Sequence, residues 1–560
     1  MIKQLIYNAF KDAANAAKEA GKIDFESLPS FAVDRPNNSV YGDYSVNLGM
    51  LFASQAKVSP RKMAQILADH LNIPPYLLDK IEITGPGFIN LFLKSAWLHE
   101  VVSEILKQGD KYGSSSYGED KKILVEFVSA NPNGPLSIPH GRGAVIGDVL
   151  CNALATAGYK VCREFYINDA ATSTQMERFG ESLYIRYLQE CGVTAAMPEE
   201  GYFGEYVTDF ARKIKAADGD KYVGQPIGEM VKEFTAIGRE EMLKWQRDML
   251  ADFGVIFDNW FSENSLLENG AVEAALTTLE KQGSTFTQDG AVWLAATKYG
   301  DVKDRPLVRS NGKPTYLAAD VAYHQNKMMR GFDTLIDIWG PDHHGYIART
   351  KAAMAALGYS ADCLKILVYH IVRLLRNSEI VNDGNGKGEI ILLSELIEAV
   401  GKDAARFFFL MCSSDIDLNF DMDLAVKESP DNPIYYVQSA HARIASILRT
   451  AEERGVKLPA NTGEVLLPLG ASEAEISLIR LLSEFPEEVN TVATLMEPHR
   501  LTRYAMDVSR EFHLFYERCP VLKTGVDPEV RDARLLLVEA AKITLCNVLQ
   551  LLGVSAPEKM

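Results

Sequence analysis

The chain has 560 residues, of which 58 are Lys or Arg and 75 are Asp or Glu, so its formal net charge is −17. Apolar residues make up 47% and charged residues 24%, which excludes disordered, collagen-like and disulfide-scaffold proteins. The acidic excess argues against non-specific coating of DNA or RNA. The seven cysteines form no C-x-x-C pair, so we expect reduced thiols, a cytoplasmic location and no structural zinc.

The first 118 residues are expected to form an α+β domain. In chain order the pattern predicts an amphipathic helix over 1–21, a turn-rich stretch over 35–47, a helix over 59–71 and two strands within 81–93. Pro60 supports the start of the second helix, because proline is favoured in a first helical turn. The stretch 109–120 is polar and rich in Gly and Ser, as linkers are, so a boundary is placed at residue 118.

Residues 119–424 alternate between strand and helix patterns. Short apolar runs predict strands over 121–128, 160–169, 335–340 and 363–372, and small residues predict a helix over 140–158. Such alternation indicates an α/β domain with a Rossmann-like parallel sheet covered by helices on both faces.

Residues 425–560 show only helical patterns, so we expect an all-α domain. The predicted helices lie at about 432–455, 472–485, 488–515 and 530–552. No apolar run of 18 or more residues occurs, so no membrane partner is expected.

One strand–loop–helix segment, 125–144, could bind a phosphate. Ligands of open α/β sheets bind beyond the carboxyl ends of the strands, where a helix N-terminus offers N–H groups and a positive dipole. His140 falls in the first turn of the helix, and Gly141 and Gly143 would let a ligand approach the backbone. The alternative is a helix start whose small residues serve packing alone.

This segment resembles the nucleotide-binding loop of class I arginyl-tRNA synthetases, which usually ends in His-x-Gly-His before a small-residue helix. Other segments are similar to that family's and follow its order along the chain: YGDYSVN, GPGFINL, FYINDA, GYFGEYV, NGKPTYLAADVAYH, IDIWGPDHHGY, GKDAARFFFL, DLNFDMDLA, NPIYYVQSAHARI and LLGVSAPEKM. The resemblance implies a tRNA-elbow domain (1–118), a catalytic domain (119–424) and an anticodon-binding domain (425–560).

An arginine ligand requires a carboxylate for its guanidinium group. Tyr316 and Asp320 are four residues apart and would share a helix face, and Glu126 with its loop could hold the α-ammonium group. The resemblance implies arginine contacts at Glu126, Ser129, Asn131, Tyr316, Asp320 and His344. It implies ATP contacts at Pro139, His140, Gly141, Gly143, Gly340, Asp342 and His343. Taken singly, each of these could be an ordinary helix or loop residue.

Two stretches depart from the family's usual catalytic motifs. The nucleotide loop has Ser137 where family members usually carry His, and Pro139 where they usually carry Gly. The Lys-Met-Ser-Lys loop is replaced by residues 382–385, without a lysine, so Lys387 and Arg142 are the candidate phosphate cations. Ser137, His140, Lys387 and Arg142 are therefore the predicted catalytic residues, with Mg²⁺ on the phosphates of ATP and no protein metal site.

Neither a phosphate loop nor a metal site fits the residues near these positions. A phosphate loop aligned on Lys387 would need glycine at Val381 and a hydroxyl at Gly388, and a calcium loop starting at Asp383 fails at its fifth and twelfth positions. His343 and His344 are adjacent, so they point in different directions and make a poor metal pair.

Two functions remain open. The first is an arginine–tRNA ligase that uses arginine, ATP and tRNA-Arg and acts as a monomer. The second is a diverged relative that binds tRNA or arginine without ligase activity. For tRNA, cations interleaved with aromatic residues suit a splayed RNA loop, although a solvated helix face is the alternative. The expected contacts are Tyr435, Tyr436, Gln438, His441, Arg443 and Arg503.

Overall fold

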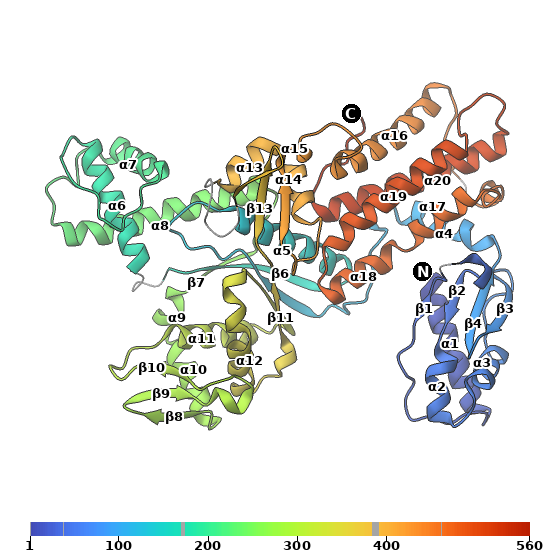
Figure 1. Ribbon diagram of the computed structural model, residues 1–560, viewed down its shortest axis with the longest axis horizontal. Coiled ribbons are helices and arrows are strands. Elements are labelled where there is room, and N and C mark those ends of the chain that lie inside the picture. The colour runs from blue at the N-terminus through green and yellow to red at the C-terminus, as the bar shows by residue number, and fades with distance from the viewer. Residues whose placement is uncertain (1, 37, 170–173, 383–390, 461) are drawn as a thin grey trace.

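The computed structural model describes residues 2–36, 38–169, 174–382, 391–460 and 462–560. It is elongated, with an N-terminal domain at one side, a sheet-based part in the centre and a helical bundle next to both (Figure 1). The N-terminal domain contains α1 (Ile2–Glu19), β1 (Val33–Asp34), η1 (Ser39–Tyr41), β2 (Tyr44–Val46), α2 (Leu48–Ala56), α3 (Pro60–Asp69), β3 (Leu78–Thr84) and β4 (Phe88–Leu93).

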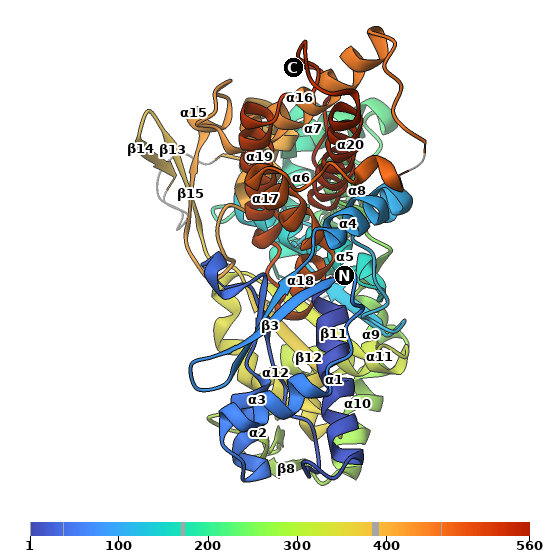
Figure 2. The ribbon, with the colours of Figure 1, turned by 90° about the vertical axis from the view of Figure 1, so that its right-hand side faces the viewer.

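The N-terminal domain confirms the expected helices and the pair of strands. Its four strands pair antiparallel in the order β1-β2-β4-β3, and α1 buries Ile6 and Phe10. The β3–β4 turn requires Gly87, whose φ is 145° and whose added Cβ would lie 2.8 Å from the carbonyl oxygen of Pro60. In Figure 2 this domain lies below the C-terminal helices, and Lys3 of α1 forms an ion pair with Glu487 at 2.5 Å.

The stretch that resembled a linker is packed into the protein. After α4 (Ala96–Gln108) and η2 (Gly109–Lys111), the side chain of Tyr112 is buried and its hydroxyl donates to the Leu482 carbonyl at 2.8 Å. Asn547 donates to the carbonyl of Tyr112 at 2.9 Å. The polar composition therefore reflects hydrogen bonds to the C-terminal helices, and the linker interpretation was wrong.

The central sheet has five parallel strands in the order β12-β11-β5-β6-β7, which confirms the expected α/β sheet. Its strands are β5 (Lys122–Glu126), β6 (Lys160–Ile167), β7 (Asn259–Ser262), β11 (Thr334–Trp339) and β12 (Leu364–Val368). Helix α5 (Ile138–Thr156) follows β5, as predicted.

One strand prediction was wrong, because the run 363–372 contributes to two sheets. β12 ends at Val368, and β13 (Val372–Arg376) pairs with β14 (Glu379–Asn382) and β15 (Leu418–Asp421). The chain changes sheets where the His370 amide donates to the Ser414 carbonyl at 2.8 Å. Helices α13 (Leu393–Val400), α14 (Lys402–Phe409) and α15 (Met422–Ala425) accompany this second sheet.

Two insertions extend from the central sheet (Figure 1). The first is helical, with its own apolar core, and contains α6 (Thr174–Glu190), α7 (Glu205–Asp218) and α8 (Ile227–Asp252). The second lies between β7 and β11 and contains α9 (Asn264–Glu268), α10 (Ala271–Lys281), β8 (Thr285–Gln288), β9 (Ala291–Leu294), η3 (Ala296–Tyr299), β10 (Arg305–Val308) and α11 (Tyr316–Met329). After β11, η4 (Pro341–Tyr346), α12 (Ile347–Ala356) and η5 (Ala361–Cys363) connect it to its parallel neighbour β12.

The C-terminal part is helical, as expected. It contains α16 (Pro433–Glu453), η6 (Glu464–Leu466), α17 (Glu473–Ser483), α18 (Phe485–Leu495), α19 (His499–Arg518) and α20 (Pro528–Leu552). The predicted helix over 488–515 is broken, because Met496 has a φ of 58° and Pro498 follows it. By length and composition α20 could cross a membrane, but 72% of its most apolar window is buried inside the protein.

A single buried arginine joins three parts of the chain. The guanidinium of Arg406 on α14 donates to the carbonyl of Leu552 at the end of α20 and to that of Phe253 after α8, both at 3.0 Å. It also pairs with Asp148 of α5 at 2.5 Å. Arg406 therefore satisfies carbonyls at two helix ends while its charge is balanced inside the protein.

Candidate active site

The predicted site residues gather at the carboxyl ends of β5 and β11. Glu126 ends β5 and is the direct neighbour of Asp337 in the sheet register, while α5 begins after the loop that follows β5. The arrangement is the one expected for ligand binding in an open α/β sheet.

Glu126 and Asp337 share one buried cation that the sequence analysis missed. The ammonium group of Lys327 on α11 lies 2.6 Å from Glu126 Oε2 and 2.7 Å from Asp337 Oδ1. Lys327 is completely buried, and although burial alone would lower its pKa, Asp337 and Glu126 raise it above the ordinary value. Lys327 follows Asp320 by seven residues on one helix face, and this spacing was the signal that could have revealed it.

His324 supplies a second cation to the same network. Its Nδ1 lies 2.7 Å from the Asp320 carbonyl oxygen and its Nε2 lies 2.8 Å from Asp337 Oδ2, and both partners are acceptors. Both ring nitrogens must therefore carry protons. Burial and Lys327 lower the pKa of His324, but Asp337 raises it further, so the net shift is upward. The two carboxylates and the two cations balance one another.

Asp320 is a further carboxyl group whose charge is not balanced by Lys327 and His324, since these two cations already neutralise Glu126 and Asp337. Its side chain has no hydrogen bond or ion pair with any residue that the structure describes, and burial raises its pKa from 3.8 to about 6. The charge of His324 acts in the opposite direction but does not cancel the effect. A carboxylate kept at such a position suits a cationic ligand.

The loop after β5 has a strained turn that aims a hydroxyl group into the site. Val128 has a φ of 68° and Ser129 a φ of 42°, and the Ser129 amide donates to the Phe127 carbonyl two residues back. This is the rare γ-turn with a positive central φ, and it is unfavourable for a β-branched residue. It places Ser129 Oγ where it donates to Glu126 Oε1 at 2.9 Å. Strain of this kind is typical of functional sites.

His140 lies in the first turn of α5, as predicted. Its Nδ1 accepts the Ser137 backbone N–H at 3.1 Å and lies 2.9 Å from Ser137 Oγ, so the proton of the neutral ring resides on Nε2. Burial lowers the pKa of His140 to about 4. The residue therefore offers a neutral N–H donor at the helix N-terminus, where the neighbouring Pro139 is well tolerated because it lies in the first turn.

Three neighbours of His140 face the protein interior. A Cβ added to Gly141 would lie 2.4 Å from the Leu393 side chain, and one added to Gly143 would lie 2.8 Å from the Tyr369 ring. These glycines therefore allow α5 to pack closely against its neighbours. Arg142 is fully buried, and its guanidinium donates to the carbonyls of His370, Ser413 and Ile416 at 2.8–2.9 Å. Arg142 is thus occupied inside the protein, which corrects its assignment as a phosphate cation.

The remaining predicted ligand contacts lie in the loop after β5, at the start of α11 and directly after β11. Tyr316 is 70% exposed at the start of α11, and Asn131 is exposed in the loop. Gly340 ends the turn after β11, followed in η4 by the exposed Asp342, His343 and His344. Lys387 lies outside the described residues, but Leu392 beyond it forms a β-bridge with Ser137 of the nucleotide loop.

Family models match the chain over most of its length. They are described as "Arginyl tRNA synthetase N terminal domain" (residues 1–93), "tRNA synthetases class I (R), catalytic domain" (101–407) and "DALR anticodon binding domain" (437–560). The chain is 48% identical to the "Arginine--tRNA ligase" of Moorella thermoacetica, covering 100% of this chain and 99% of the relative.

The chain belongs to the arginyl-tRNA synthetase family. A second relative, the "Arginine--tRNA ligase" of Carboxydothermus hydrogenoformans, is 47% identical, and the match covers 97% of each chain. Solved arginyl-tRNA synthetases share the fold. The Thermus thermophilus structure has a TM-score of 0.77 at 24% identity and 100% coverage of each chain, and the Plasmodium falciparum structure a TM-score of 0.73 at 17% identity, covering 100% of this chain and 99% of the other.

The C-terminal helices of this arginyl-tRNA synthetase carry a surface on which arginine, histidine and tyrosine side chains lie together. The Arg443 guanidinium lies over the ring of Tyr516 at 5.4 Å and 3.2 Å from His513 Nδ1, and Tyr436 packs edge-on against His513. Arg503 is also exposed. These side chains form the α16–α19 surface patch: Tyr436, Arg443, Arg503, His513 and Tyr516.

Two other predicted tRNA contacts, His441 and Gln438, form hydrogen bonds within the protein. His441 is buried, and its Nδ1 bonds the Pro557 carbonyl at 2.9 Å, which argues against direct contact with RNA. Gln438 donates to Asp403 at 2.9 Å and, with Tyr435, lines a cleft of about 440 Å³. The aromatic residues Tyr504, Phe512 and Phe515 of α19 are buried in the core.

Proposed function

We propose that the arginine pocket of this arginine–tRNA ligase is built on Asp320. The reaction has two steps: the arginine carboxylate attacks the α-phosphorus of ATP and releases pyrophosphate, and the arginyl group then passes to the ribose at the 3′ end of tRNA-Arg. The observation that supports this most directly is the half-buried carboxyl group of Asp320, which has no partner among the described residues and lies beside a charge-balanced network. A guanidinium ion completes that charge pattern.

The amino-acid end of the substrate is assigned to the loop after β5. Glu126 has one oxygen paired with Lys327 and one accepting from Ser129, yet a carboxylate has about four acceptor sites. It can therefore also accept from the α-ammonium group of arginine. Asn131, Tyr316 and His344 border the same site and are proposed to line it.

ATP is assigned to the N-terminus of α5 and to the turn after β11. His140 would donate its Nε2–H to a phosphate together with the helix dipole, and Ser137 fixes the ring that does so. Gly340, Asp342 and His343 are proposed for the nucleoside side. Mg²⁺ would arrive on the ATP phosphates, which supply most of its ligands. With Arg142 occupied, Lys387 is the remaining proposed phosphate cation.

We assign the anticodon side of tRNA-Arg to the α16–α19 surface patch and to the cleft lined by Tyr435 and Gln438. Arginine and aromatic side chains held together in this way suit phosphate contacts and base stacking. The three predicted domains, with boundaries at residues 118 and 424, the monomeric state and the cytoplasmic location complete the proposal.

ATP–pyrophosphate exchange with arginine tests the ligase function against the binding-only alternative. The exchange is run with and without tRNA-Arg, since the family generally needs tRNA for activation. Exchange that depends on arginine, together with charging of tRNA-Arg, supports the ligase. Absence of exchange under both conditions, in a protein that still binds tRNA, would establish the alternative.

A further inference from the structure

The helical insertion of α6–α8 holds the loop between β5 and α5. The backbone carbonyls of Asn131, Asn133 and Gly134 all accept hydrogen bonds from insertion side chains. The insertion follows this loop only after α5 and β6 and has a separate apolar core. Its contacts are therefore tertiary contacts that the local loop sequence does not provide.

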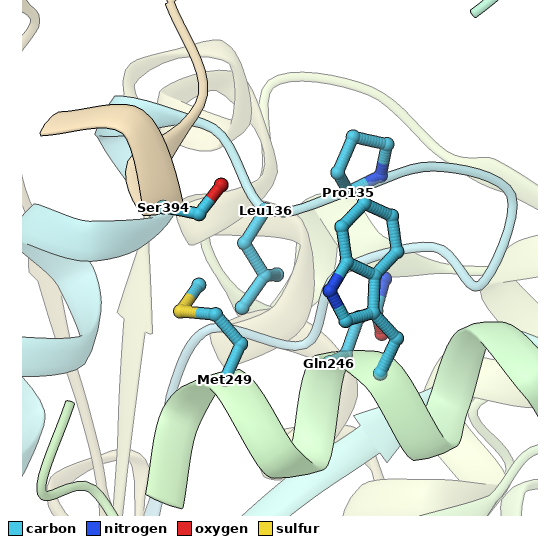
Figure 3. Close-up of a pocket in the computed structure, with 6 residues that line it drawn as sticks. Pro135, Leu136, Gln246, Met249 and Ser394 are labelled. Carbon is cyan, nitrogen blue, oxygen red and sulfur yellow. The ribbon is translucent and has the colours of Figure 1, made fainter. Parts of the chain in front are cut away.

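Gln246 of α8 makes the central contacts. It is 1% exposed, and its Nε2 donates to the carbonyl oxygens of Asn131 at 3.1 Å and Gly134 at 2.9 Å. Both partners can only accept, so the amide orientation is determined, because a reversed amide would set its oxygen against two others. Figure 3 shows Gln246 and Met249 on α8 beneath the loop residues Pro135 and Leu136.

Two tyrosines of the insertion form hydrogen bonds with Asn133, which lies between Asn131 and Gly134. The Tyr206 hydroxyl donates to the Asn133 backbone carbonyl at 3.1 Å, and the Asn133 side-chain amide donates to the Tyr202 hydroxyl at 2.8 Å. Gln246, Tyr202 and Tyr206 thus contact three of the four residues from 131 to 134.

The loop has few ways to hold itself in place. Pro132 and Pro135 lack N–H groups, and the loop is preceded by the strained turn at Val128. At its other end, Leu136 accepts from the Leu393 amide at 3.0 Å and Ser137 carries the bond to His140. A shift of the loop would therefore move the start of α5 and the His140 ring.

We propose that Gln246 is a positioning residue for ATP: by holding the Asn131 and Gly134 carbonyls it fixes the nucleotide loop, with Tyr202 and Tyr206 as its supports. This rests on the proposed assignment of ATP to the N-terminus of α5. Displacement of a reacting group by about 1 Å can lower a rate by about 100-fold, so a small movement of this loop is sufficient to impair activation.

The test uses Gln246→Met and Gln246→Glu in the full-length protein. Methionine keeps the length of the side chain without its donors, and it also removes Oε1, a buried acceptor with no hydrogen-bond partner in the described structure. Glutamate sets a carboxylate against the two carbonyls. Met242→Ala is the matched control, because Met242 is buried one turn earlier on α8 in the insertion's own core.

In ATP–pyrophosphate exchange with tRNA present, kcat/KM for ATP is expected to fall about 10- to 100-fold in Gln246→Met and further in Gln246→Glu. kcat/KM for arginine should fall less than kcat/KM for ATP, because Asn131 is the one residue held by Gln246 that is also assigned to arginine. Met242→Ala should lower Tm without raising the KM for ATP. An unchanged kcat/KM for ATP in folded Gln246→Met, or an equal loss in Met242→Ala, would overturn the proposal.

Hydrogen–deuterium exchange of residues 131–137 separates this proposal from the ATP-site assignment. Faster exchange of that peptide in Gln246→Met, and not in Met242→Ala, supports the role of Gln246 in holding the loop, independently of activity. Unchanged exchange in Gln246→Met refutes that role. If the peptide exchanges faster while His140→Ala retains the wild-type KM and kcat for ATP, the assignment of ATP to this loop is what fails.

Discussion

Replacing Asp320 by Asn should abolish arginine binding and stabilise the folded protein at the same time. Asp320 is the carboxyl group left over by the network of Glu126, Lys327, Asp337 and His324, and it has no partner among the described residues. The substitution keeps the shape of the side chain and removes its charge. Affinity and stability should therefore change in opposite directions.

The expected loss of affinity follows from removing one member of the proposed ion pair between Asp320 and the guanidinium group of arginine. Leaving a guanidinium without its carboxylate costs about 3–5 kcal/mol, so the KM for arginine should rise about 100- to 1,000-fold or more. In the wild type, arginine needs the ionised form of Asp320. Because burial raises the pKa of Asp320 to about 6, kcat/KM for arginine should fall about tenfold between about pH 7 and about pH 5.

The same substitution should raise the free energy of unfolding. A carboxyl group whose pKa rises from 3.8 to about 6 on folding favours the folded state at low pH, and this stabilisation is lost as pH rises through about 6. At about pH 7.5 the loss is up to about 3 kcal/mol, and the neutral amide of the Asp320→Asn variant would not incur it. The free energy of unfolding should thus be higher in Asp320→Asn at about pH 7.5 and equal to wild type below about pH 4.

Exchange kinetics in the presence of tRNA and urea unfolding at several pH values measure the two effects. The KM for ATP serves as the internal control, since the pKa of His140, at about 4, lies below the range used. A wild-type KM for arginine in Asp320→Asn, or a kcat/KM for arginine that is constant from pH 5 to 7, would show that Asp320 is not the guanidinium partner.

Three further variants test the other assignments. His140→Ala should lower kcat of exchange about 100- to 1,000-fold with little effect on the KM for arginine, and an unchanged kcat would remove His140 from the mechanism. Arg142→Met leaves three carbonyls without donors, so urea unfolding should show a loss of about 3 kcal/mol or more, whereas full stability would contradict its structural role. Arg443→Ala should raise the KM for tRNA-Arg and reduce its salt dependence by about one phosphate contact, and the exposed Lys281→Ala, as control, should do neither.

The sequence predicted the elements whose residues follow a clear period or lie between strong turn signals. β5, α5, β11 and the C-terminal helices were found in this way, and the order of motifs led to the family. The failures have local causes. The run 363–372 is mostly apolar, and no Gly or Pro marks the change of sheet at residues 369–371. The stretch 109–120 is polar because its groups bond distant helices.

Within the site, sequence reasoning located the loops but missed the charge partners. Lys327 and His324 stand on the same helix as Asp320, yet their pairing with Asp337 depends on the sheet register. Gln246 could not be found, because it comes from an insertion more than 100 residues beyond the loop it holds. Arg142 was assigned to phosphate because its position beside His140 does not reveal that it points inward.

The buried guanidinium of Arg406 limits how far this chain can be treated as a set of exchangeable modules. It terminates α20 and is fixed by Asp148 on the helix that begins at the nucleotide loop, while Asn152 of the same helix donates to the Leu551 carbonyl at 2.9 Å. Cutting the chain near residue 424 would leave the donors of Arg406 and Asn152 on one fragment and the carbonyls of Leu551 and Leu552 that they bind on the other. An anticodon-binding bundle grafted from a relative would therefore need the matching α5 and α14 surfaces to be transplanted with it.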